Sequence, residues 1–337
     1  MASFSQFGND LYTGARSIDF VGRRRRWYLI SLALILITVV GTVVRGGFVF
    51  SIEFTGGSEF TVSSPSSVDQ TIATTAVTAV APATVPRVSV VGDNSIRVQT
   101  GQLMTDQSAA VRTALAQAYG VGNNQVASSF IGAAWGSDVT QQAIRGLIIF
   151  VVLAALAMWA YFRTWKMSLA AIVALLHDLV IVAGVYGITG TEVSPAAVIG
   201  LLTILGYSLY DTVVVFDKIR ENTAEALSST TRTFSEIVNL AENQTLVRSI
   251  NTSIVAALPV AAILVIGAFI FGAGTLRDIS LALLIGIIVG TYSTIFVAAP
   301  LYAQLRSRES TIVTHDKRVA LVRARASTSV VQGSAEP

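Results

Sequence analysis

The stretch that decides the fold is GYSLYDTVVVFDKIREN, residues 206–222. It closes an apolar run that begins near Pro195 and is long enough to cross a bilayer, for which about 20 residues suffice. Asp211 lies inside this run, where inserting a carboxylate costs at least ~2.5–3.5 kcal/mol. A cost of this size predicts that Asp211 has either a functional use or a buried partner.

Helical spacing predicts where Asp211 points. One stripe of the helix carries small and polar residues, namely Gly200, Thr203, Tyr207 and Asp211. The opposite side carries residues that suit lipid, namely Val198, Leu202, Leu205 and Leu209. We therefore expect Asp211 to face other helices or a water-filled path. A permanent ion pair and a station on a proton or ion path both stay open, and the path is favoured.

Composition limits the classes of protein to which the chain can belong. It has 337 residues, of which 53% are hydrophobic and 13% charged, with a net charge of +3, whereas a soluble domain carries about 25% charged residues. There are no cysteines and two histidines, so thiol chemistry is excluded and a histidine metal site is not expected. No nucleophile–base pair or phosphate-binding loop is present. We expect a membrane protein that is not an enzyme and has no metal or cofactor.

Six apolar runs predict a polytopic α-helical membrane protein. The expected organisation is a cytoplasmic segment over 1–26, a first span over 27–45, an extracytoplasmic domain over 46–140, further spans within 141–304, and a basic, disordered cytoplasmic tail over 305–337. The later spans are expected near 144–162, 167–188, 195–216, 252–271 and 279–302, with a turn over 274–278. No cleavable signal peptide is expected, because the first run is too long for one.

The polar region over 46–140 predicts a small α+β domain. Its pattern indicates a strand over 51–62 that is interrupted at Gly56 and Gly57, a helix over 66–80, a hairpin around residues 92–94, a helix over 105–119 and a strand over 126–131. The order strand–helix–strand–strand–helix–strand is typical of a ferredoxin-like domain.

The basic residues predict the orientation. The run Arg23–Arg26 directly precedes the first span, and placing the N-terminus inside puts most of the 23 lysines and arginines on the cytoplasmic side. Both termini are therefore expected in the cytoplasm. The arginine run acts as a topology anchor in this interpretation, so no nucleic-acid partner is invoked.

Other polar groups fall within or beside the spans. His177 and Asp178 lie in the third span, where a stabilising pair and part of a proton relay remain equally open. Arg248 precedes the fifth span and is either an anchor, which its position favours, or a cation that sets the protonation of Asp211. Gly286 and Gly290 predict close helix packing.

Several of these motifs resemble the SecF family of protein-export membrane proteins. The residues that resemble the family's fourth-span signature are Gly206, Tyr207, Ser208, Asp211, Asp217 and the run 219–222. Residues 52–57, with Gly56 and Gly57, resemble its Gly-Gly motif, and 177–178 and 248–253 resemble its motifs in spans three and five. The similarity covers residues 20–305. Tyr210 stands where the family has asparagine, Glu53 where it has aspartate, and residues 131–134 lack a usual proline.

The resemblance implies a half-sized relative of the resistance-nodulation-division exporters. Such a subunit pairs with SecD, associates with the Sec channel (SecY, SecE and SecG), lies in the cytoplasmic membrane in contact with lipid, and uses the proton gradient to help move preproteins. It implies a proton path through Asp211 with Arg248 as its charged partner, to which we add His177, Asp178 and Tyr210 as candidates. Two alternatives stay open: a half-sized exporter of a lipid or small molecule, which a large apolar pocket in the outer domain would favour, and an assembly subunit that conducts no ions.

Overall fold

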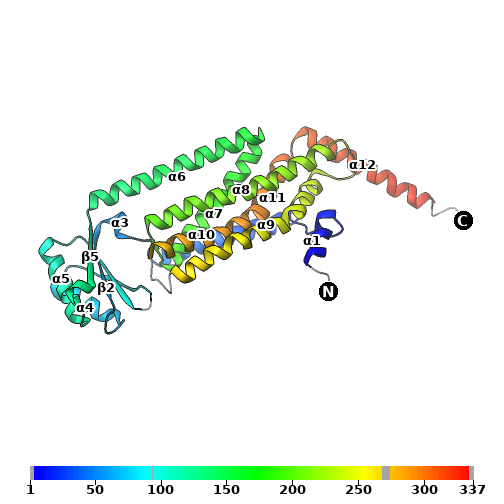
Figure 1. Ribbon diagram of the computed structural model, residues 1–337. Coiled ribbons are helices and arrows are strands. Elements are labelled where there is room, and N and C mark those ends of the chain that lie inside the picture. Colours follow the sequence, from blue (N-terminus) through cyan, green and yellow to red (C-terminus); the bar gives the residue numbers. More distant parts are fainter. Residues whose placement is uncertain (1–3, 93, 268–273, 334–337) are drawn as a thin grey trace.

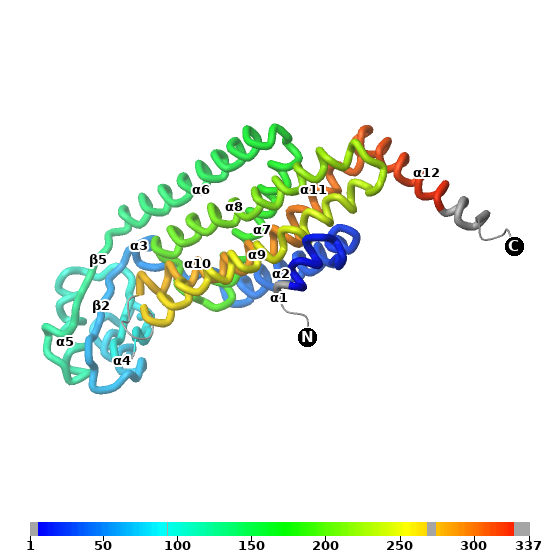
Figure 2. The backbone as a smooth tube through the Cα atoms, turned by 45° about the vertical axis from the view of Figure 1, so that its right-hand side comes forward, coloured from blue at the N-terminus to red at the C-terminus, as the bar shows by residue number. Residues whose placement is uncertain are grey.

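The computed structural model describes residues 4–92, 94–267 and 274–333. It consists of a long helical bundle with a small α/β domain at one end (Figure 1). The two termini lie at the other end of the bundle, far from the domain, in both views (Figures 1 and 2). We call these the domain end and the terminal end.

Within the described residues, the bundle contains six helices that are long and apolar enough to cross a membrane, which confirms the predicted spans. They are α2 (Arg24–Val44), α6 (Ala133–Phe162), α7 (Trp165–Thr189), α8 (Pro195–Ala226), α9 (Phe234–Val265) and α10 (Gly274–Ser293), which continues through a π-helical turn at Thr294–Ala298 into α11 (Ala299–Arg306). The Ser194 hydroxyl caps α8 by accepting a hydrogen bond from the Ala197 amide, and Pro195 opens the first turn.

Three boundaries differ from the sequence-based predictions. Helix α9 begins at Phe234, well before the predicted start of span five, because Thr233 and Glu236 form a capping box there. Helix α10 begins at Gly274, where a turn was predicted. Helix α6 begins at Ala133, inside the range assigned to the outer domain. The predicted end of span five, from 268 to 271, lies outside the described residues.

The α/β domain has the predicted ferredoxin-like order. Its elements are β2 (Gly57–Ser63), α4 (Gln70–Val80), β3 (Arg87–Val90), β4 (Ser95–Thr100), α5 (Thr105–Ala118), a short 3-10 helix (Asn123–Gln125) and β5 (Val126–Ile131). The sheet order is β3-β4-β2-β5, and every neighbouring pair is antiparallel. Residues of the sheet and of both helices form the domain's core, including Phe60, Val62, Val77, Val98, Leu115 and Tyr119. Asp93 of the predicted hairpin lies outside the described residues.

The single interrupted strand predicted over 51–62 is wrong in its first half. Residues Val49–Phe50 form β1, and Ile52–Thr55 form the short helix α3 before β2 begins. Gly56 and Gly57 have φ angles of +72° and +145°, which turn the chain between α3 and β2. Strand β1 pairs in parallel with β6 (Glu192–Val193), which lies between α7 and α8, so the root of the domain is fastened to the bundle.

The bundle is not uniformly packed. Helices α7, α8, α9 and α10 lie together, and α2 packs on α7. Helix α6 lies apart from the others over much of its length in both views (Figures 1 and 2), contacting α3, α7 and α8. It exposes large apolar side chains, including Ile148, Val152 and Leu156. Such a face suits a lipid or protein neighbour in a membrane.

The tail is not disordered as predicted. Residues Ser310–Gly333 form α12, which extends away from the terminal end (Figure 1). Ile312 is buried in the core of the bundle, and the His315 ring pairs with the carbonyl oxygen of Arg232. The Arg323 guanidinium donates to both carboxylate oxygens of Glu236 at 2.7 and 2.9 Å. These contacts give the tail a packed face that its basic composition conceals. At the N-terminus, α1 (Phe4–Thr13) packs on α9.

Candidate functional site

Asp211 is a buried acid in the middle of the bundle. Its side chain lies in α8 and is 6% exposed, which agrees with the inward orientation predicted for it. The Ser249 hydroxyl of α9 donates a hydrogen bond of 2.8 Å to Oδ1. Oδ2 is buried and has no hydrogen-bond partner among the described residues. A charged carboxylate with one neutral donor is poorly compensated in such surroundings, so the site favours a carboxyl group that can take up a proton.

Asp178 is a second buried acid, 2% exposed, on α7. The Ser208 hydroxyl of α8 donates to its Oδ2 at 2.6 Å, and His177 Nδ1 lies 3.2 Å from its Oδ1. The His177 ring stacks on Tyr292 with 6.0 Å between ring centroids, while its Nε2 is buried and no described residue forms a hydrogen bond with it. The structure therefore places His177 and Asp178 in one polar group, as both open interpretations required.

The two acids are connected through α8. Ser208, which binds Asp178, precedes Asp211 by three residues, so both side chains project from nearly the same side of the helix. Two hydroxyl pairs lie beside them: Thr212 with Thr294 at 3.0 Å, and Ser253 with Thr291 at 2.5 Å. Helices α7, α8, α9 and α10, with the π-helical turn, thus contribute to one polar core inside an apolar bundle.

Glycines on α10 let this core close. A Cβ atom at Gly290 would lie 3.0 Å from Ser208 Oγ and 3.6 Å from Asp178 Oδ2, and one at Gly286 would clash with Ile204. Both positions are buried. The predicted packing role of these glycines agrees with the geometry, since any side chain would separate α10 from α8.

The predicted sides of α8 need correction. Leu205 is buried although it was assigned to lipid, and Thr203 is exposed although it was assigned to the inward stripe. The buried face of α8 includes Ile204, Ser208 and Asp211. Helix α10 packs closely along α8, and Thr203 lies outside the side of α8 that is buried.

Arg248 does not contact Asp211. Its side chain is exposed, and among the described residues Asp211 takes part in no ion pair. Because Arg248 lies inside α9 rather than before it, adjacent residues point about 100° apart, and Ser249 is the one that reaches Asp211. Arg248 and Asp211 therefore form no ion pair in this conformation, although Arg248 lies close enough to Asp211 for an electrostatic interaction.

The remaining signature residues of α8 divide between two faces. Tyr210 is 57% exposed and Gly206 is exposed as well, so neither joins the buried acids. The Tyr207 hydroxyl is buried and lies within hydrogen-bonding reach of the Ser253 side chain. Asp217 lies toward the terminal end, where it accepts a hydrogen bond of 2.7 Å from the Tyr161 hydroxyl of α6. That contact holds α6 to α8.

Gly56 and Gly57 serve close packing at the root of the domain. A Cβ atom on Gly56 would lie 2.9 Å from the Ala133 Cα, and one on Gly57 would clash with the Thr100 carbonyl oxygen. Gly136 approaches the Phe54 carbonyl in the same way. Gly56 thus lets α3 lie against the start of α6, the helix that leaves the domain, and Gly57 lets the start of β2 lie against the end of β4.

A charged network beside this root was not predicted from the sequence. Arg97 of β4 pairs with Glu192 of β6 at 3.3 Å, and the Gln99 side chain donates to both Glu59 and Glu192. Burial raises the pKa of the Glu192 carboxyl, against the lowering effects of Gln99 and Arg97. The network joins the sheet of the domain to the segment that precedes α8. Its members are far apart in sequence, so spacing alone gave no sign of it.

Glu242 is a buried acid that sequence analysis also missed. It lies on α9, is 2% exposed, and neither carboxylate oxygen has a hydrogen-bond partner in the part of the chain that the structure describes. The signal available in the sequence was its spacing, since Glu242, Ser249 and Ser253 recur along one helical face.

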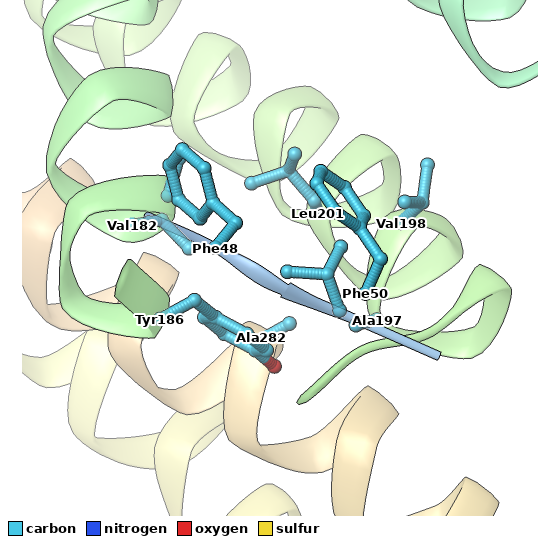
Figure 3. Close-up of a pocket in the computed structure, with 10 residues that line it drawn as sticks. Phe48, Phe50, Val182, Tyr186, Ala197, Val198, Leu201 and Ala282 are labelled. Atoms are coloured by element: carbon cyan, nitrogen blue, oxygen red, sulfur yellow. The ribbon is translucent and has the colours of Figure 1, made fainter. Parts of the chain in front are cut away.

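An apolar pocket lies at the domain end between β1, α7, α8 and α10 (Figure 3). Phe48 and Phe50 face Val182, Tyr186 and Leu201 across it. Its volume of about 180 Å³ is below the roughly 300–1,000 Å³ typical of sites for drug-sized ligands. It lies at the bundle rather than in the α/β domain, so it does not match the pocket that the small-molecule exporter alternative requires.

Together, these features define a class: a multi-pass membrane protein with protonatable groups in its core and a folded domain between its first two spans. Residues 110–308, more than half of the chain, match the family described as Protein export membrane protein SecD/SecF, C-terminal. The chain is 43% identical over 324 residues to protein translocase subunit SecF of Mycobacterium tuberculosis, covering 93% of this chain and 72% of that protein. It is also 43% identical to the Streptomyces coelicolor SecF, covering 96% of this chain and 86% of the relative.

A solved structure agrees with these similarities. The crystal structure of SecDF, a translocon-associated membrane protein from Thermus thermophilus, matches with a TM-score of 0.75 and 30% identity over 87% of this chain. The matched region is 39% of that longer chain. The chain described here therefore belongs to the SecD/SecF family of protein-export membrane proteins, as the sequence motifs indicated.

Proposed function

We propose that the chain is a SecF-type subunit that works with SecD to couple proton movement to preprotein translocation across the cytoplasmic membrane. The observation that carries the proposal is the buried Asp211 carboxyl, which accepts one hydroxyl hydrogen bond and forms no ion pair among the described residues. Support for the partner comes from the Thermus thermophilus relative named SecDF, 32% identical over 313 residues, of whose length this chain covers 39%. The SecY, SecE and SecG channel and the translocating preprotein are the further partners in this proposal.

The distribution of lysines and arginines supports a membrane orientation. The terminal end carries Arg23–Arg26 and the basic tail, so it belongs in the cytoplasm, with the α/β domain outside. The exposed apolar faces of α2 and α6 then contact lipid or the SecD half. The six spans form one half of a pseudo-symmetric unit whose other half is supplied by SecD.

In the proposed mechanism, protonation of Asp211 changes the packing of α8. The unpartnered Oδ2 receives the proton, which removes a buried charge and most of its desolvation cost. Two conformations with different affinity for the proton are then enough for coupling. One proton moving down 100 mV supplies about 2.3 kcal/mol, so several protons or a ratchet on a sliding chain are needed for long segments.

Helix α8 offers a direct route from Asp211 to the outer domain. It runs unbroken from the Ser194 cap to the terminal end, and β6 immediately precedes it. The Ser194 hydroxyl donates to Asp278 of α10 at 2.6 Å, and Glu192 of β6 pairs with Arg97 of the domain. A tilt or shift of α8 would therefore displace the sheet of the domain through this short chain of contacts.

The test uses cells whose only copy of the subunit carries Asp211→Asn. The amide is isosteric but cannot titrate, so preproteins should accumulate while membrane level and copurification with SecD stay normal. Asp138→Asn is the matched control, because Asp138 is exposed at the start of α6. Full export with Asp211→Asn would refute the coupling role and leave the assembly subunit as the better interpretation.

A further inference from the structure

Glu242 is a deeply buried carboxylic acid without a partner among the described residues. The proposed function assigns no role to it. Both of its carboxylate oxygens are enclosed without a hydrogen bond, and no ion pair reaches it among the described residues. A charged carboxylate in this position would be strongly destabilised. The group therefore rests as the neutral acid, and it can carry a proton only if water or another base reaches it.

The ionisable groups that face Glu242 are an acid and a phenol. Asp19, from the segment between α1 and α2, opposes a negative charge on Glu242, and Tyr28 of α2 lies close enough for electrostatic interaction. The Tyr28 hydroxyl is itself buried without a partner, and Arg24 acts on Tyr28 from the same helix. Neither neighbour neutralises a Glu242 carboxylate, so the surroundings hold its proton and do not bind a metal or an anion.

A cavity of about 860 Å³ lies at the terminal end beside α9. Asp19 and Asn239 line it, together with Arg232 and Glu236. Asn239 precedes Glu242 by three residues on α9, so Glu242 lies one turn, about 4–5 Å of helix rise, beyond the cavity wall. The side chain of a helical residue leans toward the helix N-terminus, which for Glu242 is the direction of the cavity.

The same face of α9 leads onward to the central acid. Ser249, the hydrogen-bond donor to Asp211, follows Glu242 by seven residues, which is two turns and about 10 Å of rise. Thr245 lies buried between them. A few water molecules, with the Thr245 hydroxyl, are enough to span that distance when the bundle opens.

We propose that Glu242 is the station that passes protons between Asp211 and the cytoplasmic cavity. This inference rests on the proposed function. In each cycle Glu242 first gives its proton to water in the cavity and becomes a carboxylate. It then takes the proton released by Asp211 through the intervening hydroxyl and water, which returns Glu242 to the neutral acid and leaves Asp211 a carboxylate that can take its next proton from the outer side. Net movement is one proton from Asp211 to the cytoplasmic side.

The test measures proton flux in proteoliposomes that contain the complex of this chain with SecD, beside an infrared readout of protonated carboxyl groups. Glu242→Gln should lose flux to the level of Asp211→Asn while keeping normal thermal stability, since the amide replaces a neutral acid of the same shape. It should also lose a carboxylic-acid carbonyl band that Asp211→Asn retains. Glu225→Gln, an exposed acid at the terminal end, is the matched control.

Several outcomes separate the two claims. Full flux with Glu242→Gln and lost flux with Asp211→Asn would overturn the Glu242 inference alone. Full flux with both variants would overturn the proposed function too. If Glu242→Gln fails to fold, Glu242→Asp provides the second test. Its shorter acid still titrates, so the inference predicts reduced flux with a displaced pH profile, and an unchanged profile would refute it.

Discussion

Replacing Gly290 by alanine should loosen the polar core without removing an ionisable group from it. The added Cβ would lie 3.0 Å from Ser208 Oγ and 3.1 Å from Ser208 Cβ, whereas comfortable carbon contacts are about 3.5–4.0 Å. Either Ser208 rotates away, or α10 and α8 move apart by a few tenths of an ångström.

Both responses cost a similar amount. If Ser208 rotates, Asp178 loses a hydrogen bond of 2.6 Å, and leaving a buried polar group unsatisfied costs about 1–3 kcal/mol. If the helices separate, overpacking costs about 1–3 kcal/mol. We therefore expect Gly290→Ala to destabilise the folded bundle by about 1–3 kcal/mol.

Gly206→Ala is the matched control. Gly206 also lies inside a helix, but a Cβ there meets no atom within 4 Å, and alanine should stabilise the helix by up to about 1 kcal/mol. Denaturant unfolding of the purified chain in detergent, followed by tryptophan fluorescence, gives the free energies. Equal stabilities for the two variants would refute the view that α10 and α8 meet through Gly290.

Three further predictions concern the parts around this core. Ser194→Ala removes the cap of α8 and a hydrogen bond to Asp278, so unfolding in detergent should show a loss of about 1 kcal/mol; an unchanged value would mean that the cap contributes nothing. Tyr119→Phe removes a buried hydroxyl that donates to the Asp69 carbonyl at 2.7 Å and accepts from the Ala73 amide at 3.1 Å. Hydrogen exchange of the backbone amides in α4 should therefore become faster by an amount equivalent to about 1–3 kcal/mol. Exchange at the wild-type rate would contradict this prediction. Burial raises the pKa of Glu192 above its usual 4.5, so the contribution of Glu192 to docking of the domain is fully present below pH 4.5 and is lost as the pH rises through the raised pKa. Spin-label distances between the domain and the bundle should therefore widen over that pH interval. A pH dependence that persists in Glu192→Gln would argue against this role of Glu192.

The six spans and the ferredoxin-like domain were predictable because both rest on short-range patterns. Long apolar runs and the order of strands and helices can be recognised from residues that are neighbours in the sequence. The start of α9 was not predictable, because Phe234, Ile237 and Val238 alternate with polar residues and lie beyond the apolar run. The same holds for α12, whose buried residues Ile312 and Val319 are separated by basic ones.

The site was predictable only in part. The inward orientation of Asp211 followed from its cost in a membrane, but its partner did not, because Arg248 and Ser249 are adjacent and point about 100° apart on a helix. The contact between Ser208 and Asp178 depends on how closely α7 and α8 approach, which spacing along one helix cannot provide. The proton path through these residues stays a prediction.

The most direct test of that path is proton uptake into inverted membrane vesicles or proteoliposomes that carry the complex with SecD. The account predicts that an imposed gradient drives proton flux through the wild type and that Asp211→Asn abolishes it, with normal complex formation and with Asp138→Asn unaffected. Wild-type flux through the Asp211→Asn complex would contradict the central claim, and Asp211 would then be a structural acid in a subunit that conducts no protons.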